Sequence, residues 1–268
     1  MKAEELKLIV KEKYGEIAEQ SNQRSSSCCG TSSCCSGVDY AVFSESYENQ
    51  KGYNPDADLN LGCGIPTEYA HIKTGDTVID LGSGAGNDCF VARALIGETG
   101  KVIGVDMTEA MINKARINTE KLGFNNVEFR LGDIENMPVS ENLADVVISN
   151  CVLNLVPNKE KAFNEIFRIL KPGGHLSVSD VVLRGELHEK IQQAAEMYAG
   201  CVSGAIDIYL YLAMMKDSGL VKIKVQKDKM ITIPDETLLN YLDQAELHAF
   251  KESGSGIFSI TVYAEKPD

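Results

Sequence analysis

Basic residues are scarce in this sequence of 268 residues, which has 26 lysines and arginines against 39 aspartates and glutamates. The net charge of −13 argues against nucleic-acid binding, because no basic stripe is available to displace counterions from phosphates. An anionic surface also accommodates a neutral or cationic small substrate more easily than a negatively charged one. The solvation of an ordinary acidic protein explains this charge equally well.

Long apolar runs are absent as well. No stretch approaches the roughly 20 apolar residues that a membrane-spanning helix needs. The N-terminal sequence MKAEELKLIVKEKYG has the pattern of a charged amphipathic helix rather than of a signal peptide. We therefore expect a cytoplasmic protein that has neither a membrane nor a nucleic acid as its partner.

Histidine is also rare, and the four histidines show no mutual spacing typical of a site. Cysteine, by contrast, is abundant, with eight residues at positions 28, 29, 34, 35, 63, 89, 151 and 201. Half of them are scattered through an α/β pattern in a chain without a signal peptide, which favours reduced thiols with a chemical role over a disulfide framework. Cys89 is the exception, since we expect it to be a buried, small apolar side chain.

The segment from Thr77 to Met107, TVIDLGSGAGNDCFVARALIGETGKVIGVDM, predicts a βαβ unit with a nucleoside site. A buried strand over 77–81 precedes a glycine loop, a helix from about Asp88 and a second strand over 102–106. The glycines let the backbone approach a ligand and leave the helix N-terminus open to an anionic group. Asp106 lies twenty residues after Gly86, where an acid at the next strand end reaches a ribose diol.

The glycine spacing is G-x-G-x-G, and no basic residue stands in the loop to meet a pyrophosphate. A ligand with a ribose and a carboxylate fits this loop better than a dinucleotide. The segment resembles the first motif of the class I S-adenosylmethionine methyltransferases. The resemblance implies that Asp80 and the loop backbone hold the methionine portion of the cofactor, the loop residues being Gly82, Ser83, Gly84 and Gly86. A glycine-rich turn beside a surface aspartate is the simpler alternative.

Downstream segments extend the same pattern. Thr108 and Gly123 are the expected ends of a helix, and strands follow over 127–131 and 144–150. In the methyltransferase pattern, Asp133 meets the adenine amino group while Met107 and Ile134 sandwich the ring; a plain turn residue is the alternative for Asp133. Asn150, like Asp80, Asp106 and Asp133, falls at the carboxyl end of a strand, where open α/β sheets bind their ligands.

These elements predict an α/β fold with a doubly wound, mostly parallel, seven-stranded sheet of Rossmann-like class I methyltransferase type. A fifth strand is expected over 175–180 and later ones near 221–225 and over 256–266, either completing the sheet, the last one antiparallel, or forming a separate layer. Further helices are expected over 4–20, 186–199 and 235–250, and a helix with a loop over 39–58, above the cofactor site. An N-terminal helix and loop and a small C-terminal extension flank the sheet.

Three cysteines have small neighbours or lie at the sheet edge. Cys63 stands between glycines in LGCG, Cys151 directly follows a strand, and Cys201 lies in YAGCVSGA. We expect exposed thiols that meet near one methyl donor. Three thiolates without histidines or carboxylates suit a soft centre such as trivalent arsenic, whose lone pair can attack a methyl carbon without a general base. A three-cysteine zinc site and independent buried cysteines are the alternatives.

The segments LGCGIP, IDLGSGAGND, GVDMT, SNCVLNLVP and GCVSGA together resemble the arsenite S-adenosylmethionine methyltransferases, in order and spacing, across roughly residues 28 to 225. The resemblance implies that Cys151 and Cys201 are the main arsenic ligands and that Cys63 is the third. It implies three parts: a helix, cysteine-rich mobile loop and lid over 1–70, a cofactor-binding core over 71–183, and the arsenic-site helix and loop with an α+β part over 184–268.

The resemblance also implies a fourth functional cysteine in the N-terminal loop, about 28 or 29 residues before the third. Counting back from Cys63 gives Cys35 (63 − 35 = 28) or Cys34 (63 − 34 = 29), in a loop that also holds Cys28 and Cys29. This thiol would form a disulfide with Cys63 during turnover, and an external reductant of glutathione or thioredoxin type would reset it. Zinc binding and incidental cysteines in a disordered segment are the other interpretations of this loop.

The function expected from this resemblance is methyl transfer from S-adenosylmethionine to arsenite, taken as a thiol adduct. Two alternatives remain open at this stage. One is a class I methyltransferase that acts on a small organic acceptor, with incidental cysteines. The other is a thiol-based metalloid binder or sensor without turnover, against which the intact glycine loop and acids weigh.

Overall fold

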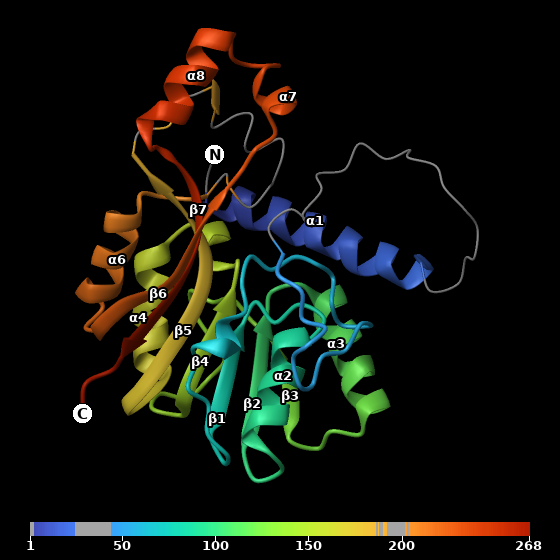
Figure 1. Cartoon of the computed structure of the whole chain (residues 1–268). Helices are drawn as coiled ribbons and strands as arrows, with labels where there is room; N and C mark the ends of the chain where they lie inside the picture. Colours follow the sequence, from blue (N-terminus) through green and yellow to red (C-terminus); the bar gives the residue numbers. More distant parts are fainter. Residues whose placement is uncertain (1–2, 25–43, 186, 188–189, 192–201, 203) are drawn as a thin grey trace.

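The computed structural model describes residues 3–24, 44–185, 187, 190–191, 202 and 204–268. One seven-stranded sheet in the order β3-β2-β1-β4-β5-β7-β6 organises them (Figure 1). The strands are β1 (Thr77–Leu81), β2 (Lys101–Asp106), β3 (Val127–Leu131), β4 (Ala144–Asn150), β5 (Leu170–Arg184), β6 (Val221–Ile231) and β7 (Gly256–Glu265). The first five strands are parallel, and β7 lies antiparallel between β5 and β6. The predicted doubly wound, mostly parallel class I methyltransferase fold is confirmed.

The pleat of β1 explains why three of its five residues, Val78, Ile79 and Leu81, are apolar and lie on both faces of the sheet. Ile79 and Leu81 pack into one cluster with helices α4 (Lys159–Ile169) and α6 (Ile208–Asp217). Val78 packs into the cluster on the opposite face, with α2 (Asn87–Ile96) and α3 (Glu109–Leu122). Because helices cover both faces of the sheet, its central strands need apolar side chains on both sides.

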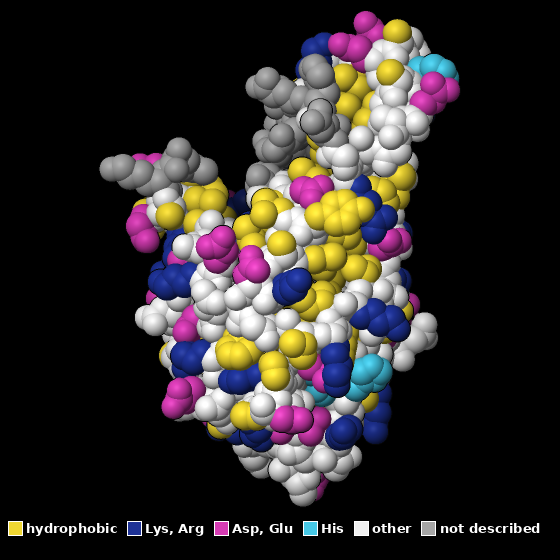
Figure 2. All heavy atoms as spheres, turned by 90° about the vertical axis from the view of Figure 1, so that its left-hand side faces the viewer, with side chains coloured by type: hydrophobic (Ala, Val, Ile, Leu, Met, Phe, Trp, Pro, Cys, Tyr) yellow, Lys and Arg dark blue, Asp and Glu magenta, His cyan; other side chains and the backbone are white. Residues whose placement is uncertain are grey.

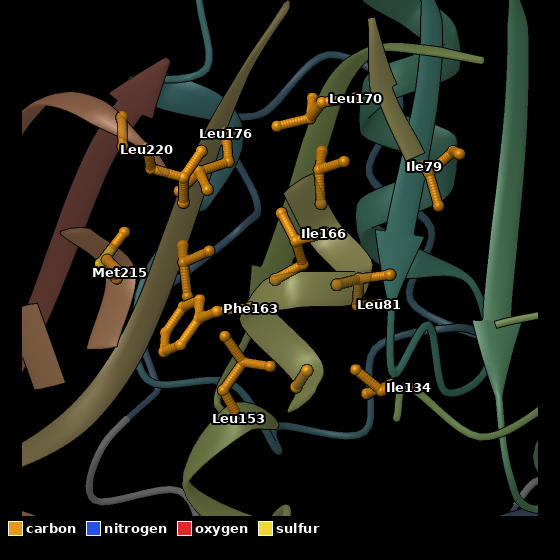
Figure 3. Close-up of a cluster of buried hydrophobic side chains, with 14 of the residues drawn as sticks. Ile79, Leu81, Ile134, Leu153, Phe163, Ile166, Leu170, Leu176, Met215 and Leu220 are labelled. Atoms are coloured by element: carbon orange, nitrogen blue, oxygen red, sulfur yellow. The ribbon is translucent and has the colours of Figure 1, made fainter. Parts of the chain in front are cut away.

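The larger cluster has an aromatic centre. Phe163 of α4 and Tyr211 of α6 meet edge to face, with ring centroids 5.3 Å apart at an interplanar angle of 89°. Figure 3 shows the α4 side chains Phe163 and Ile166 lying between Leu81 of β1 and Met215 of α6. This packing fixes α6, which carries Tyr211, against the middle of the sheet.

Several element boundaries differ from the sequence prediction. The strands predicted over 175–180 and 221–225 extend to Leu170–Arg184 and Val221–Ile231, because β7 pairs along the whole length of both. The late strands therefore complete the one sheet. The helix predicted over 235–250 is two helices, α7 (Asp235–Leu238) and α8 (Gln244–Ser253), and Asp243 begins the second with a capping box.

The N-terminal part is helical where the sequence predicted it, in α1 (Ala3–Arg24). A helix and a loop were predicted over 39–58, but residues 44–58 contain no helix: they form turns closed by backbone hydrogen bonds and lead to η2 (Pro66–Glu68). Residues 39–43 and most of the helix expected over 186–199 lie outside the described residues. A second short helix, η3 (Leu153–Leu155), follows β4.

The C-terminal helices form a projecting lobe. In Figure 1, α7 and α8 stand above the carboxyl edge of the sheet, on the extended ends of β6 and β7. The lobe side chains Leu238, Leu242 and Leu247 are buried in a cluster that also holds Cys63 and Cys151. The lobe therefore contributes to the apolar surroundings of these two cysteines.

The side of the molecule that carries α6 and β6 shows a mixed surface (Figure 2). Apolar side chains gather in its upper and middle parts, whereas lysines, arginines and acids intermingle lower down. Tyr209 and Leu210 of α6 and Met230 of β6 are among the exposed apolar residues of the chain. Among the described helices, none is both long and apolar enough to cross a bilayer.

We predict that Phe163→Ala lowers the free energy of unfolding by about 3–5 kcal/mol, because it leaves a cavity beneath Tyr211. Chemical denaturation measures this loss. The control is Ile117→Ala, at a site that is 54% exposed and should stay within about 0.5 kcal/mol of the wild type. Equal effects of the two changes would contradict the proposed packing.

Candidate functional site

A deep cleft opens where the strand order reverses, at the carboxyl ends of β1 and β4. It encloses about 1090 Å³ of empty space, including the solvent at its mouth. Its walls hold ten of the fifteen site residues predicted from the sequence: Asp80, Gly82, Ser83, Gly84, Asp106, Met107, Asp133, Ile134, Asn150 and Cys151. The fold therefore assembles the predicted residues around one cavity.

The glycine loop forms the floor of this cleft. Gly82, Gly84 and Gly86 all have positive φ angles, of 68°, 50° and 100°. A Cβ on Gly82 would come within 2.3 Å of Val152, and one on Gly86 would come within 2.9 Å of Phe129, whereas Gly84 has nothing within 4 Å of that position. Two of the glycines are thus required by packing, and Gly84 leaves its backbone open to a ligand.

Asp106 at the end of β2 braces the loop. Its Oδ2 accepts a hydrogen bond from the Gly84 N–H at 3.0 Å, and its Oδ1 accepts one from the Thr108 N–H at 2.8 Å. Burial raises the pKa of this carboxyl, and the two backbone donors oppose the rise. The Thr108 side chain is a third donor to this carboxylate, which leaves room for about one more hydrogen bond, for instance from a hydroxyl in the cleft.

The N-terminal helix forms the wall of the cleft beside Asp133, a contact that was not predicted from the sequence. Lys7 of α1 donates to Asp133 Oδ2 at 2.7 Å and to Glu135 Oε2 at 2.9 Å. Val10 and Tyr14 of the same helix also line the cleft. The amphipathic pattern predicts that one face of α1 packs on the protein, but the partner of that face is decided by the tertiary fold.

Two acids, the buried Asp80 and the partly buried Asp88, line the cleft near the glycine loop. Burial and the neighbouring charge of Asp88 raise the pKa of Asp80 well above its usual range. Burial raises the pKa of Asp88 to about 6, although hydrogen bonds from Tyr47 and Asn150 oppose this rise. The Cys89 thiol, buried as predicted, donates to Asp80 Oδ2 at 3.2 Å. A cation in the cleft would relieve the repulsion between the two carboxylates.

Tyr47 and Asp88 are cleft residues that the sequence analysis missed. The Tyr47 hydroxyl donates to Asp88 Oδ1 at 2.7 Å, and the Asn150 Nδ2 donates to the Tyr47 hydroxyl at 2.8 Å. An acid in the first turn of a helix after a glycine loop is a signal that could have identified Asp88. No sequence pattern singles out Tyr47, which reaches the cleft from a turn.

Cys63 and Cys151 come together in one buried cluster, but the predicted exposure of their thiols is wrong. Cys63 is 1% exposed and Cys151 is 3% exposed. The glycines beside Cys63 serve close packing: a Cβ on Gly62 would lie 2.5 Å from Asn150 Nδ2, and one on Gly64 would lie 2.6 Å from Ser179 Oγ. Val202 belongs to the same cluster.

The segment that carries Cys151 is held by the neighbouring strand. Cys151 has a φ of 58°, unusual for a residue with a side chain, and its N–H donates to the Ser179 carbonyl at 2.7 Å. Asp180 lies next on β5, fully buried, and accepts from the Val181 N–H at 3.0 Å and the Tyr211 hydroxyl at 3.1 Å. The Asn154 N–H also reaches Asp180, which connects this carboxyl to the Cys151 segment.

Asp180 and Tyr211 are electrostatically unusual. Burial raises the pKa of Asp180 to about 7, while its N–H donors and the charge of Lys159 oppose the rise. Burial, Asp180 and the two thiols of Cys63 and Cys151 raise the pKa of Tyr211 well above its usual range. From the sequence, Asp180 was predicted to end the strand, and no role was assigned to this residue.

Five of the eight cysteines are not among the described residues. Cys201 and the loop cysteines Cys28, Cys29, Cys34 and Cys35 lie outside the described residues. The described cysteines Cys63, Cys89 and Cys151 form no disulfide bonds. In the described part of the chain, no three His, Cys, Asp or Glu side chains cluster as the ligands of a metal ion would.

Comparisons with known proteins identify the family. A family model described as a methyltransferase domain matches residues 72–243. The arsenite methyltransferase of Halobacterium salinarum is 38% identical over 280 residues, covering 98% of this chain and 67% of that protein. This chain belongs to the arsenite methyltransferase family. The arsenite methyltransferase of Aquipseudomonas alcaligenes is 32% identical, and the alignment covers 88% of this chain and 68% of that protein.

Other family members are longer than this chain. The mouse arsenite methyltransferase is 34% identical over 76% of this chain, which spans 55% of the mouse protein. Among solved structures, an arsenic(III) S-adenosylmethionine methyltransferase from Chlamydomonas reinhardtii is 30% identical, with a TM-score of 0.64, over 88% of this chain and 75% of that one. YcgJ from Bacillus subtilis, 19% identical with a TM-score of 0.61, shares the fold.

The buried Asp180 makes a pH-dependent contribution to stability. Its pKa in the folded protein, about 7, exceeds that of an unfolded aspartate, so the folded state binds this proton more tightly. The stabilising contribution of Asp180 is therefore fully present at low pH and is lost as the pH rises through about 7. We predict that between pH 5 and pH 8 the wild type loses roughly 2–4 kcal/mol more unfolding free energy than Asp180→Asn does. Denaturant unfolding at both pH values tests this, and parallel pH profiles would contradict it.

Proposed function

We propose that this protein transfers methyl groups from S-adenosylmethionine to trivalent arsenic held by cysteine thiolates. One observation carries the proposal: Cys63 and Cys151 belong to the same buried cluster, and Cys151 also lines the cleft. Thiolates in apolar surroundings suit a soft, thiophilic acceptor. Relatives of this family named for arsenite methylation support the same acceptor.

The residues of the cleft fit the cofactor. S-adenosylmethionine supplies an electrophilic methyl group on a positively charged sulfur when it is bound. Asp80 and Asp88 form an acidic pair in the cleft whose ionised forms a cationic group would stabilise. Asp106 would accept from the ribose hydroxyls, and Met107 and Ile134 line the cleft beside Asp133 for the adenine ring. The open backbone of Gly84 would receive the methionine portion.

Arsenic capture is an exchange of thiols. Arsenite arrives as an adduct of glutathione or another thiol, and Cys151, Cys201 and Cys63 replace the carrier thiols with a proton returned to each of them. Three sulfur ligands would leave arsenic with a lone pair that can act as a nucleophile. Bound S-adenosylmethionine would supply the electrophilic methyl group for that lone pair and would keep the electron pair of its broken carbon–sulfur bond. The main contribution of the protein is to hold the acceptor in line in a site that excludes water.

Methyl transfer formally oxidises arsenic to the pentavalent state. One of the N-terminal loop thiols, with Cys34 or Cys35 favoured by spacing, attacks the arsenic-bound sulfur of Cys63. The electron pair of the broken arsenic–sulfur bond stays on arsenic, a disulfide forms, and the loop thiol releases one proton. An external thiol reductant of glutathione or thioredoxin type then reduces that disulfide by exchange. This cycle leaves trivalent methylated arsenic as the product.

We predict that Cys151→Ser abolishes arsenic methylation, since a hydroxyl is a hard ligand that binds trivalent arsenic poorly. The assay combines purified protein, arsenite, a dithiol and methyl-labelled S-adenosylmethionine, followed by arsenic speciation. Cys89→Ser serves as the matched control for arsenic capture, because Cys89 packs in a different cluster on the other side of the sheet.

Three outcomes of this assay would overturn the proposal. Full methylation by Cys151→Ser would remove Cys151 from the site. Arsenic that is bound by the wild type but never methylated would indicate a metalloid binder. Wild-type protein that neither binds nor methylates arsenic would point to an organic acceptor.

Cofactor affinity should depend on pH through Asp88. Because its pKa is about 6 and only the ionised form attracts a cation, binding of S-adenosylmethionine should strengthen as the pH rises from 5 to 7. Isothermal titration calorimetry measures the affinity. In Asp88→Asn the cofactor should bind more weakly, with a flatter pH dependence, and an unchanged slope would exclude Asp88 as its source.

A further inference from the structure

Asn150 contacts the protein backbone on both sides of Cys63. Its Oδ1 accepts from the Cys63 N–H at 3.0 Å, and its Nδ2 donates to the Gly64 carbonyl at 2.8 Å. The loop approaches so closely that only glycine fits at position 62, where a Cβ would lie 2.5 Å from the amide nitrogen. One carboxamide therefore fixes the backbone of this thiol at two points.

The orientation of this amide is set by its surroundings. Three acceptors face the Nδ2: the Gly64 carbonyl at 2.8 Å, the Tyr47 hydroxyl at 2.8 Å and Asp88 Oδ2 at 3.2 Å. A flipped amide would place an oxygen against these groups and a nitrogen against the Cys63 N–H. The network therefore requires the amide oxygen to face Cys63.

Ser259 of β7 also binds the backbone of Cys63. The Ser259 Oγ on β7 donates to the Cys63 carbonyl at 2.5 Å, and Ser259 is buried. The Cys63 N–H and C=O are thus each bound by a side chain, from β4 and β7 respectively. Since both strands belong to the rigid sheet, the position of Cys63 is tied to the sheet rather than to its own loop.

The same contacts relate Cys63 to Cys151. Asn150 immediately precedes Cys151, whose N–H is anchored to the Ser179 carbonyl at 2.7 Å. The Asn150 side chain therefore holds Cys63, and the next residue in the chain is Cys151, although the two cysteines are 88 positions apart (151 − 63). Asp88 connects this pair to the floor of the cofactor cleft.

We propose that Asn150 and Ser259 are positioning residues that hold Cys63 as the third sulfur ligand of arsenite. This inference rests on the proposed function and deepens it. Arsenite has three exchangeable positions and needs a third thiolate, whereas a monomethylated trivalent arsenical has two and is held by the other thiolates of the site. Loosening Cys63 should therefore weaken the binding of arsenite but not that of the monomethylated arsenical.

The test compares Asn150→Ala and Ser259→Ala with the wild-type protein on two substrates. The glutathione adduct of arsenite should show a KM raised about tenfold in each variant, the size expected for loss of a buried hydrogen bond. With S-adenosylmethionine saturating in every assay, the KM for the glutathione adduct of methylarsonous acid should stay within about twofold of wild type in Ser259→Ala, because Ser259 does not line the cofactor cleft as Asn150 does. Arsenic X-ray absorption of the arsenite complexes should show three sulfur neighbours in the wild type and two in the variants.

Asn126→Ala is the matched control. The Asn126 amide also binds two loop carbonyls, those of Gly97 and Gly100 at 2.9 Å, at the edge of the sheet opposite the cleft. This variant should lose a similar amount of stability without changing either KM. A selective effect in Asn126→Ala would mean that general loosening, not the hold on Cys63, produces the signature.

The possible results distinguish a failure of this inference from a failure of the proposed function. Three-sulfur coordination with a wild-type KM for arsenite in both variants would overturn the inference and leave the proposed function intact. Equal loss on both substrates would also overturn it, because it would indicate a general structural role. A wild-type protein that binds no arsenite would overturn the proposed function and this inference together.

Discussion

The parallel pairing of β1 with β4 is the constraint on which the rest of this structure depends. It places the strand-order reversal between two carboxyl ends, so the glycine loop after β1 and the Asn150–Cys151 segment after β4 face the same cavity. Sheet geometry thereby brings together a nucleoside site and a thiol from distant parts of the sequence. The acids at these strand ends are buried because helices and the lobe cover the sheet, and burial raises their pKa values.

The two halves of the site are built from different kinds of interaction. The cleft side is lined by acids, of which Asp80 and Asp88 have raised pKa values and would be stabilised in their ionised forms by a cationic ligand. The thiol side is an apolar cluster covered by the C-terminal lobe, and its polar groups serve to hold backbone. Asn150 and Asp88 lie where the two sides meet and bond to each other. A soft acceptor and a charged donor can be bound side by side because each side keeps its own polarity.

Local patterns predicted the central strands well. The predicted bounds of β1, β3 and β4 agree with the structure, because β1 and β4 are mostly apolar, β3 alternates apolar and charged residues, and each ends at a glycine or a polar residue. The lengths of β5 and β6 were underestimated, since their outer residues are ordered by pairing with β7 rather than by local preference. The turns of 44–58 were mistaken in part for a helix, because aromatic residues in a polar segment carry no clear period.

The sequence by itself determined the chemistry that this protein can offer: the glycine loop, the strand-end acids and the cysteines, each identifiable from its neighbours. Only the tertiary structure decided what surrounds those groups. It buried Cys63 and Cys151, which the adjacent glycines had suggested were exposed, and it brought Tyr47 and Lys7 into the cleft. The physical reason is that glycine spacing shows that something approaches the backbone closely, but not whether it is a ligand or, as at Gly62, another side chain of the same protein.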